Sequence, residues 1–310
     1  MSANHNRGWL HIEDLYKSYG SKLVLDNIDL SVSRAELCTV VGPSGCGKST
    51  LLRQILGEEA PDKGHITLEG RDVGFPDTRR GIVFQRYSLF PHLSVLDNVT
   101  LGPRLTSGLF ERRRRRREFE ADAMTHLERM RLAEHAHKYP HELSGGMQQR
   151  VAIAQALMLK PAVLMMDEPF GALDPDTREQ MQLLLLELWE AEQMTVFFVT
   201  HDLEEAVFLG TRILVLSQYY TDDRGDDRGD DRGDDRGGTV RRGAKIVADY
   251  QLPRAATATD VKRSPEFAKL VGEIRDLGFN PDFRRHVRDF DLRHPHSFRT
   301  LTPEEYRESQ

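Results

Sequence analysis

The sequence predicts an α/β fold with an antiparallel β-subdomain and a helical insertion. An apolar run of strand length, 37–41, is followed at once by a glycine-rich loop and by a segment of helical spacing, 49–56. Two later apolar runs, 163–166 and 195–200, each end abruptly at polar residues, as buried strands of a parallel sheet do. Short strand-like runs with turn signals precede the loop, and residues 93–160 have mainly helical spacing.

The composition is that of a globular protein with a substantial core. The chain has 310 residues, of which 39% are hydrophobic and 30% charged. No stretch approaches the roughly 18 consecutive apolar residues of a spanning helix, and the first residues lack an apolar signal region, so we expect a cytoplasmic protein. The net charge of −6 gives no support for general nucleic-acid affinity. Cys38 and Cys46 form no disulfide framework, and we expect both to be reduced.

Residues 42–50 fit the pattern G-x-x-x-x-G-K-[ST] of a phosphate-binding loop. Glycines let the backbone curl around an anion, so that successive N–H groups and the helix N-terminus point at the phosphates. Lys48 is expected to reach the outer phosphates and Ser49 to ligate magnesium. The nucleotide-binding candidates here are Gly42, Pro43, Ser44, Gly45, Cys46, Gly47, Lys48, Ser49 and Thr50.

The segments before this loop read as the strands Trp9–Ile12, Leu23–Leu25 and Ile28–Val32, with a turn at Gly20 and Ser21. A similar strand pattern at 64–70 suggests a small antiparallel sheet. Tyr19 lies just before the turn, where its ring either stacks on a purine or packs on a neighbouring strand.

A buried-strand pattern at 81–85 ends in Gln85, and ligands are usually met at such strand ends. The amide oxygen of Gln85 suits a metal's coordination shell, and it equally suits the cap of a turn. The helical stretch that follows is interrupted by Pro103, Gly108 and Pro140, and we interpret it as an insertion.

Six consecutive arginines, Arg112 to Arg117, stand among Glu111, Glu118 and Glu120. Six like charges cannot all lie on one helix face, and the acidic neighbours partly offset them. The stretch is interpreted as a solvated helix start, with contact to RNA or lipid headgroups as the alternative.

A second anion-binding arrangement is predicted at residues 143–150. Ser144 is a natural N-cap for the helix that follows, and Gly145 and Gly146 leave its first turn uncovered.

Three further predictions concern strand ends and caps. The adjacent carboxylates Asp167 and Glu168 follow an apolar run, where Asp167 suits a magnesium shell and Glu168 the orientation or deprotonation of a water. Asp174 caps a helix whose first residue is Pro175. His201 follows the strand 195–200, where it is placed to hydrogen-bond a terminal phosphate.

Together these motifs resemble the ATPase subunit of an ATP-binding cassette (ABC) transporter over roughly residues 8–249. They occur in the family order: GPSGCGKS, VFQ, LSGGMQQR, VLMMDEP, GALD and the histidine His201. The stretches FQRYSLFPHLSVLDNV, MDEPFGALDPDTR and THDLEEAVFLG resemble the importer branch that serves nitrate, sulfonate and taurine uptake. Gln155 departs from the family, which commonly has arginine there.

The resemblance implies an ABC ATPase fold, with a P-loop NTPase core, that binds ATP and Mg²⁺ and hydrolyses ATP. Tyr19 would stack on adenine, Glu168 would be the catalytic base and His201 would sense the γ-phosphate. The implied magnesium ligands are Ser49, Gln85 and Asp167. The residues implied to serve the nucleotide of an opposite subunit are Ser144, Gly145, Gly146 and Gln148, with Asp174 at the same interface.

The resemblance also implies partners. Two cassettes, expected to be identical, would pair head to tail on the cytoplasmic face of the inner membrane. A permease would be contacted at about 87–98, and a solute-binding protein would act indirectly. Export is disfavoured because no transmembrane domain is fused. The alternative function is a soluble ABC-type ATPase acting on nucleic acid or ribosomes, in which the arginines would bind nucleic acid.

The implied domain is 8–250, with a helical subdomain at about 88–160. Asp-Asp-Arg-Gly occurs four times in succession at 222–237, and this segment has no apolar residue to bury, so we expect a mobile hairpin tip. Residues 251–310 are expected to form a C-terminal helix, which begins at Ser264-Pro265-Glu266, runs through Leu277 and is ended by Gly278, and a polar tail.

Overall fold

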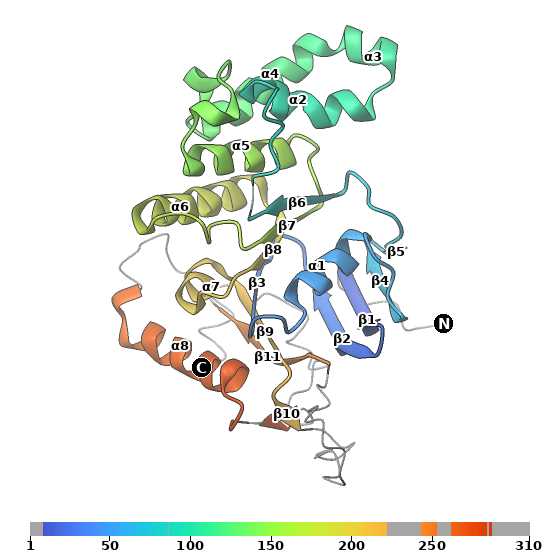
Figure 1. The fold of residues 1–310 in the computed structure, drawn as a ribbon, viewed down its shortest axis with the longest axis vertical. Helices are drawn as coiled ribbons and strands as arrows, with labels where there is room; N and C mark the ends of the chain where they lie inside the picture. Colours follow the sequence, from blue (N-terminus) through green and yellow to red (C-terminus); the bar gives the residue numbers. More distant parts are fainter. Residues whose placement is uncertain (1–8, 86, 222–242, 253–261, 284, 287–310) are drawn as a thin grey trace. The chain divides into compact units, whose positions relative to one another are not determined.

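The computed structural model describes residues 9–85, 87–221, 243–252, 262–283 and 285–286 (Figure 1). The chain divides into two compact units, one made of residues 1–75 with 199–310 and the other of residues 76–198. The Asp-Asp-Arg-Gly repeats and the tail after residue 286 lie outside the described residues, so the predictions made for them stay predictions.

The first unit contains both an antiparallel sheet and part of a parallel one. Its elements are β1 (Leu10–Tyr19), β2 (Lys22–Val32), β3 (Leu37–Val41), α1 (Lys48–Leu56), β4 (Lys63–Leu68), β5 (Arg71–Asp72), α7 (Leu203–Leu209), β9 (Arg212–Ser217), β10 (Tyr220–Thr221), β11 (Lys245–Gln251), α8 (Pro265–Phe279) and β12 (Arg285–His286).

The antiparallel β-subdomain is confirmed as a sheet of order β2-β1-β4-β5. Tyr19 pairs with Lys22 across the predicted turn, where Gly20 has a φ of 60°. β1 and β2 are longer than predicted and run on through polar residues such as Lys17, because the hairpin pairs the backbone whatever the side chains are. Register shifts and the left-handed Asp14 and Asn27 accommodate the polar interruptions.

In the first unit β3 is fully buried and pairs in parallel with β9, which pairs antiparallel with β11. The buried Arg212 of β9 ties this region together. Its guanidinium donates to Asp249 at 2.8 and 2.6 Å and to Glu36 at 3.1 Å. α8 is capped by Ser264 and ends at Phe279, so Gly278 lies inside the helix rather than after it.

The second unit contains the helical insertion and further strands of the α/β core. Its elements are β6 (Arg80–Phe84), α2 (Val95–Thr106), α3 (Leu109–Arg114), α4 (Arg116–Arg129), the 3₁₀ turns η1 (Ala133–His135) and η2 (Pro140–Glu142), α5 (Gly145–Leu157), β7 (Val163–Asp167), α6 (Pro175–Glu192) and β8 (Thr195–Val199). The second unit ends at Phe198 in β8, and the last residue of this strand, Val199, already belongs to the first unit. The strand order here is β8-β7-β6, and β6 pairs with β7 in parallel.

Two helical predictions need correction. Pro103 does not interrupt α2, which runs on to Thr106, because packing of the buried proline outweighs its low helix propensity. The arginine run does not start one helix. α3 ends at Arg114 and α4 begins at Arg116, with Arg115 as the cap between them.

Among the residues that the structure describes, no helix is long and apolar enough to span a bilayer.

Candidate functional site

The loop 42–50 connects β3 to α1 in the first unit. A Cβ on Gly42 would lie 2.0 Å from the carbonyl oxygen of Leu216, which leaves room for glycine alone. Gly47 is the N-cap of α1 and has a φ of 113°, a conformation that other residues rarely adopt. The loop therefore ends on an open helix N-terminus, the arrangement that holds phosphate groups.

Lys48 is the buried cation of this loop. Its ammonium donates to the carbonyl oxygens of Gly42 at 2.8 Å and Pro43 at 3.0 Å, which holds the charge inside the curve of the loop. Burial raises the pKa of the Cys46 thiol, so this cysteine stays protonated beside Lys48. Ser49 and Thr50 follow in the first turn of α1.

The structure brings Tyr19 next to the loop. Tyr19 ends β1, its hydroxyl donates to the Glu59 carboxylate, and it also hydrogen-bonds the side chain of Thr50. Partial burial and the bond to Glu59 raise the pKa of Tyr19. The hydroxyl is thereby anchored and the Lys17 ammonium lies over the ring, 5.7 Å from its centroid, while 44% of the residue stays exposed and open to stacking.

His201 lies beside the strand that enters the loop. The N–H of Thr200 donates to the carbonyl of Val40 in β3 at 3.2 Å. His201 is exposed and lines a cavity of about 510 Å³ with Asp202, Leu203, Glu204, Arg275 and Phe279.

Glu205 is a positioning residue that the sequence reasoning missed. It is buried in the first turn of α7 and accepts a hydrogen bond of 2.6 Å from the Thr200 hydroxyl, which fixes the backbone next to His201. In the sequence it looks like one of two glutamates that complement a helix dipole after the Asp202 cap, so only its burial sets it apart.

In the second unit, parallel pairing brings Gln85, Asp167 and Glu168 to one sheet edge. Phe84 of β6 is the register partner of Asp167 of β7. Gln85 and Glu168 are the next residues of the two chains, so both follow the carboxyl ends of adjacent strands. The Gln85 amide lies against Gly171, where a Cβ would be 3.2 Å from its nitrogen. This is the edge at which α/β sheets bind ligands.

The backbone of Glu168 is strained. Its φ is 47°, in the left-handed region, although it is neither glycine nor asparagine and precedes Pro169. Strained residues cluster at functional sites, although the chain has others away from this sheet edge, such as Arg131 and Lys160. The left-handed conformation of Glu168 could not be predicted from the motif, because sequence rules expect this conformation at glycine.

The predicted cap of α5 is confirmed. The Ser144 hydroxyl accepts from the N–H of Met147 at 3.4 Å, and the amide of Gln148 donates to the carbonyl of Leu143 at 3.1 Å. Gly145 packs against Tyr87, and Gly146 packs against Thr177. A Cβ on Gly145 would lie 2.6 Å from the Tyr87 hydroxyl, and one on Gly146 would lie 2.5 Å from the Thr177 methyl group, so neither position has room for a side chain. Gln155 lies half-buried further along α5.

Asp174 is confirmed as the cap of α6, and it accepts from the N–H of Thr177 at 3.0 Å. This backbone hydrogen bond lowers the pKa of Asp174. Since Thr177 also packs on Gly146, the α6 cap and the start of α5 lie together.

The predicted residues thus form two groups. The loop 42–50, Tyr19 and His201 belong to the first unit. Gln85, Asp167, Glu168, Asp174 and the α5 start belong to the second. The amide of Gln85 and the carboxylate of Asp167 offer at adjacent strand ends the hard oxygen donors that Mg²⁺ prefers, whereas Ser49 lies in the other unit.

Comparison with known proteins shows the family to which the chain is similar. The ABC transporter family profile matches residues 25–171. The chain is 43% identical over 259 residues to the taurine import ATP-binding protein of Rhizobium johnstonii, covering 82% of this chain and 88% of the relative. It is 41% identical over 274 residues to the nitrate import ATP-binding protein of Synechocystis sp., covering 86% of this chain and 94% of the relative.

The chain is also similar to solved structures of ABC transporter components. cbiO1 from Clostridium perfringens, part of the ABC transporter complex cbiONQ, matches with a TM-score of 0.60 and 28% identity over 67% of this chain and 84% of that chain. A dimeric bacterial ABC transporter cassette matches with a TM-score of 0.56 and 33% identity, covering 66% of this chain and 93% of that one.

Proposed function

This chain belongs to the ABC transporter family and is an ATPase that couples hydrolysis to transport, and we propose that it drives import of a small solute through a separate permease. The observation that carries the import assignment is identity above 40% with taurine and nitrate import proteins over more than four fifths of the chain. A taurine-like sulfonate, nitrate or another small nitrogen compound is therefore the proposed solute class. The nucleic-acid alternative gains no support from these relatives.

In this proposal the first unit binds the nucleotide. Tyr19 stacks on adenine with the exposed part of its ring, since its hydroxyl is already held by Glu59 and Thr50. The N–H groups of the loop and the buried Lys48 hold the phosphates, because both concentrate positive charge on the inner side of the curve. His201 receives the γ-phosphate next to the loop.

The second unit supplies the hydrolytic groups. Together with Ser49 of the first unit, Gln85 and Asp167 would hold Mg²⁺, which would neutralise phosphate charge. Glu168 accepts a proton from the attacking water, and its strained backbone fixes the direction of the carboxylate. Gln85 lies beside Glu168 because β6 and β7 are in register at Phe84 and Asp167.

Two copies of the chain are proposed to complete each site head to tail. The open start of α5, capped by Ser144, offers a second set of backbone donors for the ATP held by the partner's loop. Gly146 and Asp174 lie together through Thr177 and would form this interface. A matching cassette structure is dimeric.

The proposed function also places the protein at a membrane and gives it partners. The dimer sits on the cytoplasmic face of the inner membrane and receives the permease at about 87–98, while a solute-binding protein acts on the permease. The domain limits 8–250 and the helical subdomain at about 88–160 also remain proposals.

The test is ATP turnover by Glu168→Gln in the full-length protein. This variant is expected to bind ATP with unchanged affinity, to accumulate as a dimer and to lose turnover by at least about a hundredfold. Glu179→Gln, an exposed change on α6, is the matched control and should hydrolyse ATP at the normal rate. Normal turnover by Glu168→Gln would show that another group is the base.

A further inference from the structure

A cavity in the helical part of the second unit is not used by the proposed ATPase site. It has a volume of about 610 Å³, within the usual range for ligand sites, and lies among α2, α3 and α4. Its lining combines apolar side chains, Leu109, Phe110 and Phe119, with guanidinium groups from all three helices. An apolar and cationic lining fits an amphipathic anion.

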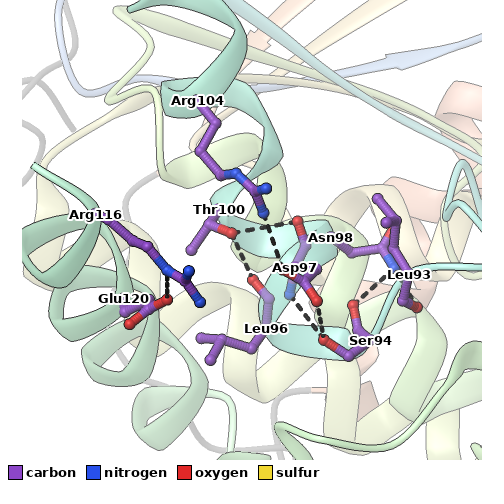
Figure 2. Close-up of polar contacts among 9 residues, drawn as sticks. All are labelled: Leu93, Ser94, Leu96, Asp97, Asn98, Thr100, Arg104, Arg116 and Glu120. Carbon is purple, nitrogen blue, oxygen red and sulfur yellow. Dashed lines mark hydrogen bonds and ion pairs between the residues drawn. The ribbon is translucent and has the colours of Figure 1, made fainter. Parts of the chain in front are cut away.

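Two of the lining arginines are already paired. Arg104 of α2 contacts Asp97 at 2.9 Å, and Arg116 of α4 contacts Glu120 at 2.7 Å, as Figure 2 shows. Thr100 lies near both, and its hydroxyl donates to the carbonyl of Leu96. These ion pairs fix the α2 and α4 sides of the cavity.

The arginines of α3 differ. Arg112, Arg113 and Arg114 also line the cavity, and none of them forms an ion pair with any residue that the structure describes. Residues 109–120 hold six arginines against three glutamates, an excess of three positive charges in a chain whose net charge is −6. The excess of positive charge in residues 109–120 favours binding of an anionic partner from outside the chain.

α3 also exposes apolar surface. None of its residues is buried, and Leu109 and Phe110 are 79% and 91% exposed. Leu105, at the end of α2, is 70% exposed. On α3, Leu109 and Phe110 lie one turn before Arg112 to Arg114, so apolar and cationic side chains are exposed together, as contact with both the headgroups and the acyl boundary of a membrane requires.

We propose that α3, with the cavity behind it, binds anionic phospholipid at a membrane surface. Arg112, Arg113 and Arg114 contact the headgroup phosphates, and Leu109 and Phe110 enter the acyl boundary. The inference rests on the proposed function for one point only, that the cassette works beside a membrane. It gives the cassette a lipid contact of its own, separate from the permease.

The experiment is vesicle flotation with the full-length protein, without permease or nucleotide. The wild type should float with vesicles of phosphatidylcholine mixed with an equal amount of phosphatidylglycerol, and not with phosphatidylcholine alone. Each arginine near an anionic surface changes affinity about fivefold, so Arg112→Gln/Arg113→Gln/Arg114→Gln should weaken binding about a hundredfold. Phe110→Ser should weaken it about tenfold.

The matched control is Arg117→Gln. Arg117 is exposed on α4, forms no ion pair with a described residue and does not line the cavity. Arg113→Gln should therefore reduce binding more than Arg117→Gln does. Because all these side chains lie at the surface, the variants should unfold at the wild-type temperature and keep ATP turnover.

Four results would overturn the proposal. The first is a triple variant that binds vesicles as the wild type does, and the second is an equal loss of vesicle binding in Arg113→Gln and Arg117→Gln. The third is full release of the wild type from vesicles by soluble glycerol phosphate. The fourth is a triple variant that loses binding to polyuridylic acid but still binds vesicles. The last two would identify a free phosphate site and an RNA site. A wild type that floats but does not hydrolyse ATP would refute the proposed function and leave the lipid site standing.

Discussion

Phe84 of β6 and Asp167 of β7 are register partners in a parallel pair. Each strand therefore delivers its next residue, Gln85 or Glu168, to the same edge of the sheet. A parallel pair permits this, whereas an antiparallel pair would send the two residues to opposite edges. Strand pairing thus brings the proposed water-activating residue and its neighbouring glutamine to one edge of the sheet.

We predict that Gly47→Ala weakens ATP binding about tenfold or more. Alanine is disfavoured at a φ of 113°, and its Cβ would lie 2.9 Å from the Leu25 side chain, so the loop must shift. Equilibrium dialysis with ATP measures the effect. Gly272→Ala is the control, because it lies inside α8 with open space around it and should stabilise the protein by roughly 0.5–1 kcal/mol. Unchanged ATP affinity in Gly47→Ala would mean that this loop conformation is not required.

We predict that Asp249→Asn destabilises the protein by about 3 kcal/mol in urea unfolding, because it leaves the buried Arg212 undercompensated. Burial alone would lower the pKa of Arg212, but hydrogen bonds to Asp249 outweigh it and raise this pKa. Glu69→Gln removes the exposed partner of Arg34 and should cost at most about 1 kcal/mol. Equal losses in the two variants would contradict the account.

We predict that stability falls with acid partly through His126. Burial lowers the pKa of His126 below its ordinary value of 6.5, and its buried Nδ1 has no hydrogen-bond partner among the described residues. Below pH 6.5 the unfolded chain binds a proton that the folded chain resists, so folding stability drops until the lowered pKa is reached. Melting temperatures between about pH 5 and 7 should vary less in His126→Leu than in the wild type. Identical pH slopes in both proteins would remove His126 as the cause.

The motifs with fixed spacing could be predicted from the sequence, because they place chemistry on local backbone geometry. The caps Ser144 and Asp174 are confirmed, as are the strand ends at Gln85 and Asp167. Local signals also gave the turn after Tyr19 and the antiparallel β-subdomain.

Features that depend on tertiary contacts could not be predicted from the sequence. Glu205 looks like an exposed helix residue until burial and Thr200 show its role. Pro103 continues a helix because packing outweighs its propensity, and the arginine run divides between two helices. The left-handed Glu168 is imposed by the surrounding fold.

The central claim is that one chain's loop and another chain's α5 start form a single ATP site. Ser44→Cys and Ser144→Cys place reactive thiols at two exposed positions. The native Cys38 and Cys46 should stay silent, because both are buried and burial raises the pKa of each thiol. Glu168→Gln, added to both chains, preserves the ATP.

The deciding measurement is disulfide cross-linking of an equal mixture of these two proteins under mild oxidation, followed on a non-reducing gel. The account predicts a cross-linked dimer that forms only in the mixture and only with ATP. A mixture that stays monomeric with ATP, or a single chain carrying both cysteines that cross-links within itself, would contradict it.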